Sequence, residues 1–295
     1  KCGVIAKAEE VLKELPIQDT VTWNALMGGY NRCGRHHEVL NCYESVQSKG
    51  IAANVVTYIC ILKACSSIGS VVRGKEIHEE ILSRGLIEKD VVLGTALIDM
   101  YAKCGALSKA QQILEELPTR NIIMWSALIA GHVRQGNGKE ALKYFECMKH
   151  EGLSPDVVTF ICLLKACGKT RSFGKGEQIH EEIVSKGLLE KNDVVLGSAL
   201  IDMYAKNGRF EDAHILFEYI TNRNLVTWTS TIGRYAKHSD LYNAIGCFQC
   251  MQTEAFKPNG ETFTSLLSCC GQLGLVHEDN NTFLSMMNDH GETND

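Results

Sequence analysis

Apolar residues recur at spacings of three and four along most of this chain, as expected for helices that bury one face. Between residues 91 and 121 two such stripes follow each other. The first contains Val92, Ala96, Leu97, Met100 and Tyr101, and the second contains Leu107, Ala110, Ile113, Leu114 and Leu117. Gly105 lies between the stripes and predicts a turn between two helices. The pattern therefore predicts a helical hairpin.

The hairpin pattern repeats along the whole sequence. Residues 91–103 return almost unchanged at 194–206, and Trp23, Trp125 and Trp228 are spaced by 102 and 103 residues. Each long period divides into repeats of 35, then 36 or 37, then 31 residues. Their boundaries are 20–54, 55–90, 91–121, 122–156, 157–193, 194–224, 225–259 and 260–295, with residues 1–19 as the end of a further repeat. We therefore expect one all-α domain, a right-handed superhelical solenoid of helical hairpins.

Two other residue types recur at fixed places in the repeats. The prolines are expected to end second helices, because each falls among the last residues of a repeat: Pro16, Pro118, Pro155 and Pro258. Aromatic residues at repeat positions four and eleven are expected in the core: Trp23, Trp125, Trp228, Tyr30, Tyr101, Tyr204 and Tyr235. A surface that meets a long repeating ligand has reason to be written several times along a chain, whereas an active site has none.

Composition narrows the class of protein. The chain has 295 residues, of which 45% are hydrophobic and 22% charged, and no apolar run reaches membrane-spanning length. Its 13 cysteines fall mostly at apolar helix positions, which indicates reduced core residues in a reducing compartment. A formal net charge of -5 is unusual for a nucleic-acid-binding protein, so such a function would need a local basic stripe.

The repeat lengths and their local sequences resemble the P, L and S repeats of pentatricopeptide repeat proteins of the PLS class. Val21-Thr-Trp-Asn24-Ala-Leu-Met-Gly-Gly-Tyr30 resembles the start of a P repeat. Thr57-Tyr-Ile-Cys-Ile-Leu-Lys-Ala-Cys65 resembles an L repeat, and Ala96-Leu-Ile-Asp-Met-Tyr-Ala-Lys-Cys104-Gly105 an S repeat. The resemblance covers the whole chain. It implies a plant organelle protein that binds single-stranded RNA without a cofactor, in many cases as a guide for cytidine-to-uridine editing.

In this family each repeat meets one base through its fifth and last residues. The resemblance implies that the base-reading pairs here are Asn24 with Asn54, Thr95 with Asn121, Ser126 with Asp156, Ser198 with Asn224, and Thr229 with Asn259. A carboxylate accepts from the donors of guanine, and an amide serves the donor and acceptor of adenine. The L repeats have Ile59 and Ile161 at the fifth position, which cannot hydrogen-bond to a base. They are expected to separate the base-reading repeats without reading a base themselves. The implied site, 5′ to 3′ in chain order, is Y-n-A-G-n-A-A.

Two further positions in the repeats are candidates for RNA contact. The second residue is a branched aliphatic that in the family sandwiches a base: Val21, Val56, Val92, Ile123, Val158, Val195 and Val226. Ordinary packing at the start of a helix is the alternative explanation. The thirteenth residue of each P and S repeat is basic, which predicts a ladder of phosphate contacts: Lys1, Arg32, Lys103, Arg134, Lys206 and Lys237.

One constellation of residues suggests a zinc deaminase, since such enzymes combine His-x-Glu with Pro-Cys-x-x-Cys. The chain contains His78-Glu-Glu80, His180-Glu-Glu182 and Cys247-Phe-Gln-Cys250. Both His segments occupy the same place in two L repeats, however, and no proline precedes Cys247. We therefore expect neither a metal site nor an enzyme, and any editing chemistry would come from a deaminase or editing-complex protein in trans.

Two alternatives remain from the sequence. A tetratricopeptide-like scaffold that binds a peptide would have the same hairpin stack, but it keeps a uniform 34-residue period and has no evident reason for Asn or Asp at each repeat end. A decayed array that binds nothing tightly is the other alternative. The chain begins within a repeat, with no initiator Met or transit peptide, so both ends are expected to be truncated. Mitochondrial or chloroplast localisation is implied by the resemblance alone.

Overall fold

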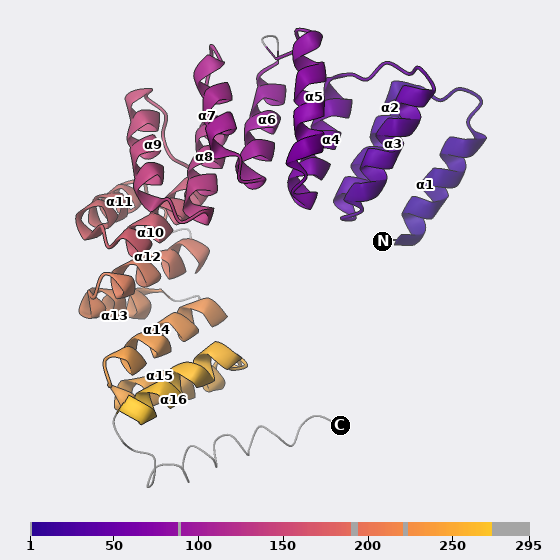
Figure 1. Ribbon diagram of the computed structural model, residues 1–295. Helices are drawn as coiled ribbons and strands as arrows, with labels where there is room; N and C mark the ends of the chain where they lie inside the picture. The colour runs from indigo at the N-terminus through magenta and orange to yellow at the C-terminus, as the bar shows by residue number, and fades with distance from the viewer. Residues whose placement is uncertain (1, 88–89, 190–193, 221–223, 273–295) are drawn as a thin grey trace. The chain divides into compact units, whose positions relative to one another are not determined.

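A computed structural model describes residues 2–87, 90–189, 194–220 and 224–272, and over that range all regular structure is helical (Figure 1). The helices are α1 (Cys2–Glu14), α2 (Thr20–Arg32), α3 (His36–Ser48), α4 (Val55–Ile68), α5 (Val71–Ser83), α6 (Val91–Lys103), α7 (Leu107–Glu116), α8 (Ile122–Arg134), α9 (Gly138–His150), α10 (Val157–Thr170), α11 (Phe173–Ser185), α12 (Val194–Lys206), α13 (Phe210–Tyr219), α14 (Leu225–Lys237), α15 (Leu241–Thr253) and α16 (Gly260–Gln272). The expected all-α fold is confirmed.

The helices assemble into two compact parts, residues 1–162 and 163–295. Within each part, the first helix of a repeat packs against its own second helix and against the first helix of the following repeat. In the first part α6 contacts α7 and α8 in this way, and in the second part α14 contacts α15 and α16. Both parts are therefore built as stacks of helical hairpins, as the apolar stripes predict.

The stripes form the core between hairpins. Met27, Tyr58, Leu97, Ile129 and Leu200 are among the residues that are fully buried. The tryptophans of the P repeats are buried as expected: Trp23, Trp125 and Trp228. Burial of three of the tyrosines is also confirmed, whereas Tyr235 is half-buried and its hydroxyl lies 2.7 Å from Nδ1 of His214. The position-eleven aromatic thus keeps its polar end at the edge of the core.

Residues with positive φ, rather than the prolines, end several second helices. α9 ends at His150, five residues before Pro155, and Gly152 has a φ of 73°. The amide of Leu153 donates to the carbonyl of Met148 at 3.2 Å, which closes the helix end without a proline. Gly105, at φ 82°, makes the predicted turn between α6 and α7. The expectation that Pro155 ends its helix was therefore wrong.

The described cysteines form no disulfide bonds. Cys42, Cys65, Cys167 and Cys269 are buried, and burial raises the pKa of the Cys42 and Cys65 thiols to about 11. Such thiols stay protonated and unreactive at neutral pH. Cys250 is exposed, so the expectation of core placement was wrong for this residue.

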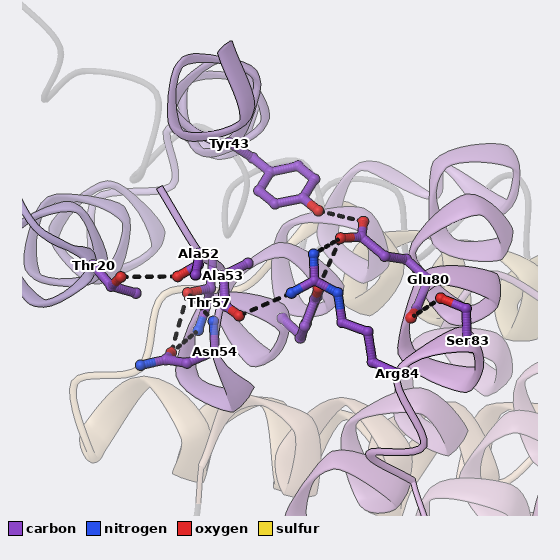
Figure 2. Close-up of polar contacts among 10 residues, drawn as sticks. Thr20, Tyr43, Ala52, Ala53, Asn54, Thr57, Glu80, Ser83 and Arg84 are labelled. Atoms are coloured by element: carbon purple, nitrogen blue, oxygen red, sulfur yellow. Dashed lines mark hydrogen bonds and ion pairs between the residues drawn. The ribbon is translucent and has the colours of Figure 1, made fainter. Parts of the chain in front are cut away.

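A half-buried carboxylate ties one L repeat to its neighbour. Glu80 on α5 accepts hydrogen bonds from the hydroxyls of Tyr43 on α3 and Tyr58 on α4, and the Arg84 guanidinium donates to it at 2.7 Å (Figure 2). Arg84 also donates to the carbonyl of Ala53 at 3.2 Å, in the segment that leads into α4. Both oxygens of the carboxylate thus accept hydrogen bonds, and the network links α3 of one hairpin to α4 and α5 of the next.

Gly131 permits close packing of α8 on the preceding hairpin, and its replacement tests that packing. A Cβ at this position would lie 2.7 Å from Cδ2 of Leu107 and 3.1 Å from Cβ of Ala102. The equivalent Gly29 has nothing described within 4 Å of such a Cβ. We expect Gly131→Ala to lower the free energy of unfolding by about 1–3 kcal/mol through overpacking. Gly29→Ala should raise it by up to about 1 kcal/mol through helix propensity. Urea denaturation measures both, and equal effects of the two substitutions would contradict this packing.

Two buried histidines, His78 and His132, and the half-buried His180 predict a loss of stability in acid. Burial lowers the pKa of His78, His132 and His180 below the ordinary value of 6.5. The unfolded chain therefore binds protons at a pH where the folded chain does not, so stability is full above about pH 6.5 and is lost as the pH falls below it. Thermal unfolding midpoints at pH 7.5 and 5.5 should differ accordingly. His132→Phe should reduce the difference, because no partner to either ring nitrogen of His132 is found in the described chain. Identical midpoints in the parent protein would exclude a contribution from these rings.

Candidate nucleic-acid interface

The last side chain of each repeat caps the first helix of the next repeat wherever the structure describes both. Asn54 Oδ1 accepts from the backbone amide and the hydroxyl of Thr57, both at 3.1 Å (Figure 2). The same bond to the second or third residue of the following helix is made by Asp19, Asp90, Asn121, Asp156, Asn224 and Asn259. Asn and Asp are favoured at this position because the side-chain oxygen satisfies an otherwise unpaired amide at the helix start.

This cap occupies only one polar atom of each side chain. The cap bonds go to Oδ1, which leaves Oδ2 of Asp156 and Nδ2 of Asn54, Asn224 and Asn259 outside the cap. Asp19, Asn54 and Asp156 are exposed, and the other described terminal residues are half-buried. Figure 2 shows the Asn54 side chain with its nitrogen turned away from Thr57. The cap therefore holds the second polar atom of Asn54 and of Asp156 in a fixed place at an exposed junction.

The structure brings the fifth residue of each repeat to the last one. Asn24 Nδ2 donates to Asn54 Oδ1 at 3.0 Å, and Asn121 Nδ2 donates to Thr95 Oγ1 at 3.3 Å. Ser198 Oγ lies 3.4 Å from Asn224 Oδ1.

The other two pairs meet through a threonine of the following repeat. Ser126 Oγ lies 2.5 Å from Thr159 Oγ1, which donates to Asp156 Oδ1 at 2.6 Å. Thr262 joins Thr229 to Asn259 in the same way, at 3.3 and 2.8 Å.

Three of the fifth residues are themselves buried. Ser126, Ser198 and Thr229 are 8%, 5% and 6% exposed, and each hydroxyl donates to the carbonyl four residues earlier. Asn24 and Thr95 are half-buried. The buried hydroxyls orient the terminal side chain, while the terminal side chain offers the accessible atom. Ile59 and Ile161 are half-buried and carry no hydrogen-bonding group at this position.

The second residue of each repeat stands in solvent. The exposed fractions range from 52% to 69% for Val21, Val56, Val92, Ile123, Val158, Val195 and Val226. Branched aliphatic side chains lose free energy by exposure to water, so their recurrence at one exposed position indicates a contact surface. Exposure to this extent argues against the alternative, ordinary packing at the helix start.

The basic residues at position thirteen are exposed, but two have acidic partners that the sequence analysis missed. Lys103 Nζ lies 2.7 Å from Asp99 and Lys206 Nζ lies 2.6 Å from Asp202. Arg134 donates to the carbonyl of Lys103 at 3.3 Å, whereas Arg32 and Lys237 are exposed at the ends of their helices. Lys1 lies outside the described residues. The pairing could have been found from the i,i+4 spacing of opposite charges.

Capping also corrects an argument drawn from the sequence. Asp90 caps α6 although it ends a repeat whose fifth residue is Ile59, and Asp19 caps α2 in the same way. A peptide-binding scaffold of helical hairpins would therefore have a reason to place Asn or Asp at repeat ends. The identity of these residues alone does not separate RNA binding from peptide binding.

The residues that resembled a deaminase site have structural roles in the described chain. His78 Nδ1 lies 3.1 Å from the hydroxyl of Tyr101, His180 Nδ1 lies 2.8 Å from that of Tyr204, and Glu80 is held by two tyrosines and Arg84. Among the described residues, no three His, Cys, Asp or Glu side chains gather closely enough to hold a metal ion. In the same part of the chain, the search for helices long and apolar enough to span a membrane finds none.

Comparison with known proteins places the chain in a family. The model of the PPR repeat family matches residues 18–67 and 120–169. The model of the PPR repeat matches residues 56–86, 95–122, 158–188, 198–225, 226–256 and 261–278. Together these segments cover more than half of the chain.

Curated relatives agree with the family models. The Arabidopsis thaliana pentatricopeptide repeat-containing protein At2g03380, mitochondrial, is 34% identical over 99% of this chain and 42% of its own length. The chloroplastic protein At4g18520 from the same plant is 34% identical over 93% of this chain and 44% of its own. The chain thus spans less than half the length of these two relatives.

Solved structures show the same fold. The pentatricopeptide repeat protein PPR10 in complex with an 18-nt psaJ RNA element matches with a TM-score of 0.77 at 20% identity, over 90% of this chain and 40% of that one. PPR10 from maize, in a further crystal structure, matches with a TM-score of 0.51 at 20% identity, over 97% of this chain and 51% of that one. On the family models and these relatives, the chain belongs to the pentatricopeptide repeat family.

Proposed function

We propose that this chain is a PLS-class array that binds single-stranded RNA and reads one base with each P or S repeat. The observation that carries the proposal is the recurring junction. One capped Asn or Asp presents a polar atom outside the cap there, beside an exposed Val or Ile, in Asn54, Asn121, Asp156, Asn224 and Asn259, and that atom of Asn121 also donates to Thr95. The likeness to PPR10, which was crystallised with an RNA element, supports the same class of ligand.

Capping gives the terminal residue a definite hydrogen-bonding character. Because Oδ1 is engaged at the helix start, a terminal Asn offers its Nδ2 donor, and the terminal Asp156 offers its Oδ2 acceptor. The Watson–Crick edge of adenine has an acceptor ring nitrogen where guanine has a donor. An Asn therefore suits adenine, and Asp156 suits guanine. Beside them, the second residues of adjoining repeats offer an apolar surface to the faces of each base.

The proposed site is 5′-Y-n-A-G-n-A-A-3′ in chain order. Thr95 with Asn121 reads adenine, and Ser126 with Asp156 reads guanine. The pair Asn24 with Asn54 is assigned a pyrimidine on the family resemblance and not on the cap, which would also suit adenine. Ser198 with Asn224 and Thr229 with Asn259 both read adenine. The L repeats contribute the unread positions, since neither Ile59 nor Ile161 can hydrogen-bond to a base.

The biological setting follows from the relatives. They carry the designations mitochondrial and chloroplastic, so we assign this chain to one of these organelles. There it would act as the recognition part in processing or cytidine-to-uridine editing of a transcript. In editing, a deaminase or another editing-complex protein would supply the chemistry in trans.

Fluorescence anisotropy tests the proposal directly. We expect an RNA that contains U-n-A-G-n-A-A to bind more tightly than a scrambled RNA of identical composition, both at low salt and at physiological salt. Equal affinity for the two RNAs would leave only phosphate attraction and would refute the base assignments. Absence of binding to either RNA, by a protein that circular dichroism shows to be helical, would favour the peptide-scaffold alternative.

The single carboxylate among the base-reading residues gives the sharpest mutational test. Asp156→Asn keeps the cap oxygen but replaces the outer acceptor with a donor, so preference at this repeat should move from guanine to adenine. The shift should be about 1–3 kcal/mol if RNA contacts discriminate as good base contacts on DNA do. Binding to RNAs that carry G or A at the fourth position measures it. A uniform loss of affinity for both RNAs would mean that Asp156 supports the helix and reads no base.

A further inference from the structure

The three repeat types differ in charge at their ninth residue. It is Gly28, Ala130 or Gly233 in the P repeats, Lys63 or Lys165 in the first two L repeats, and Asp99 or Asp202 in the S repeats, whereas the last repeat, 260–295, has the uncharged Ser268. The ninth residue lies one helical turn after the fifth and one turn before the thirteenth. It therefore shares the helix face that carries the proposed base and phosphate contacts. Charge on this face thus varies in step with the repeat type.

In the S repeats the acidic ninth residue holds the basic thirteenth. The Lys103 ammonium lies 2.7 Å from the Asp99 carboxylate, and the Lys206 ammonium lies 2.6 Å from that of Asp202. A phosphate that approaches either lysine has to displace this carboxylate or bind beside its negative charge. The S repeats are therefore weak sites for the RNA backbone, although each carries a lysine at the expected position.

In the L repeats the cation itself occupies the ninth position. Lys63 and Lys165 are exposed, and within the described chain no carboxylate lies within 4.0 Å of either ammonium. The residue one turn earlier is Ile59 or Ile161, so no acidic side chain precedes the lysine on this face.

The L-repeat lysines adjoin the predicted phosphate ladder in each part of the molecule. In the first part, Asn31, next to Arg32, donates to the carbonyl of Cys60 at 2.9 Å, one turn before Lys63. Burial raises the pKa of the Cys60 thiol, and the positive charges of Lys63 and Arg32 oppose that rise. In the second part, a Cβ at Gly168 would lie 3.1 Å from Cδ of Lys206, and Gly168 is one turn from Lys165.

We propose that the ninth residue sets how strongly each repeat holds the RNA backbone. Lys63 and Lys165 bind phosphates, and Asp99 and Asp202 restrain Lys103 and Lys206 from doing so. The L repeats, which read no base, are then the anchors of the strand, while neighbouring repeats read its sequence. This inference rests on the proposed function, since it assigns roles within the same RNA-binding surface.

The test is the salt dependence of RNA binding in four double variants of the full chain. The slope of log K against log salt is negative, and loss of two phosphate contacts reduces its magnitude by about 1.4 for a single strand. We expect this loss for Lys63→Ala/Lys165→Ala, and a clearly smaller one for Lys103→Ala/Lys206→Ala. Asp99→Asn/Asp202→Asn should bind about two- to fivefold more tightly, as expected for the release of exposed ion pairs. Each of the three effects should have the same size with the U-n-A-G-n-A-A RNA as with its scrambled control.

The matched control is Lys75→Ala/Lys139→Ala, which removes the same charge from exposed positions on the second helices α5 and α9. Its slope should stay close to that of the parent, and thermal unfolding midpoints should show that every variant is folded.

Equal slopes for the Lys63/Lys165 and Lys75/Lys139 variants would overturn the ninth-residue inference, and so would weaker binding by the Asp99/Asp202 variant. If the parent chain bound the designed and scrambled RNAs equally, the base assignments would fail while these slopes still tested the phosphate contacts. If it bound neither RNA, both proposals would be overturned.

Discussion

The bond between the last side chain of one repeat and the first backbone amides of the next helix is the constraint on which the structure depends. It joins consecutive hairpins and fixes where each first helix begins. It also commits one oxygen of each described terminal Asn or Asp and, in Asn54 and Asp156, leaves the other polar atom for a ligand. A single hydrogen bond thus determines both the stacking of the repeats and the character of the surface that they present.

Around this junction, neighbouring positions on the first helix have separate tasks. The fifth residue is mostly buried and steadies the terminal side chain, and the second residue stands exposed beside it. The ninth and thirteenth residues carry charge whose sign depends on the repeat. Because these positions are three or four residues apart, a change at one of them leaves the apolar face of the same helix intact. This separation lets repeats differ in ligand chemistry while they keep one packing arrangement.

Much of the fold could be predicted from the sequence, because apolar spacing and repeated segments report directly on which face of each helix is buried. The turn at Gly105 and the buried tryptophans are examples. The helix end before Pro155 was missed because Gly152, three residues earlier, already closes α9 in a left-handed conformation. A proline cannot lie in the interior of a helix without disrupting it, but its position does not show at which earlier residue the helix ends.

The candidate site was predicted less completely, since its positions were taken from a family resemblance that says nothing about competing interactions. Asp99 and Asp202 were overlooked although they precede Lys103 and Lys206 by four residues. The role of Asn and Asp in capping was also missed. The same residue types suit base contacts and the unpaired backbone amides at a helix start, so the residue type alone does not distinguish the two roles. Burial of Ser126 and Ser198 depends on contact with the next hairpin, which sequence spacing does not report.

The exposed Val and Ile side chains at position two have a thermodynamic consequence. In the free protein each is surrounded by water, and a base that lies flat against it would release that water. Attraction between lysines and phosphates releases ions instead and removes little apolar surface. The change in heat capacity on association therefore distinguishes two ways of holding a strand. It is negative when bases are sandwiched between apolar side chains, and it is close to zero when only the backbone is held.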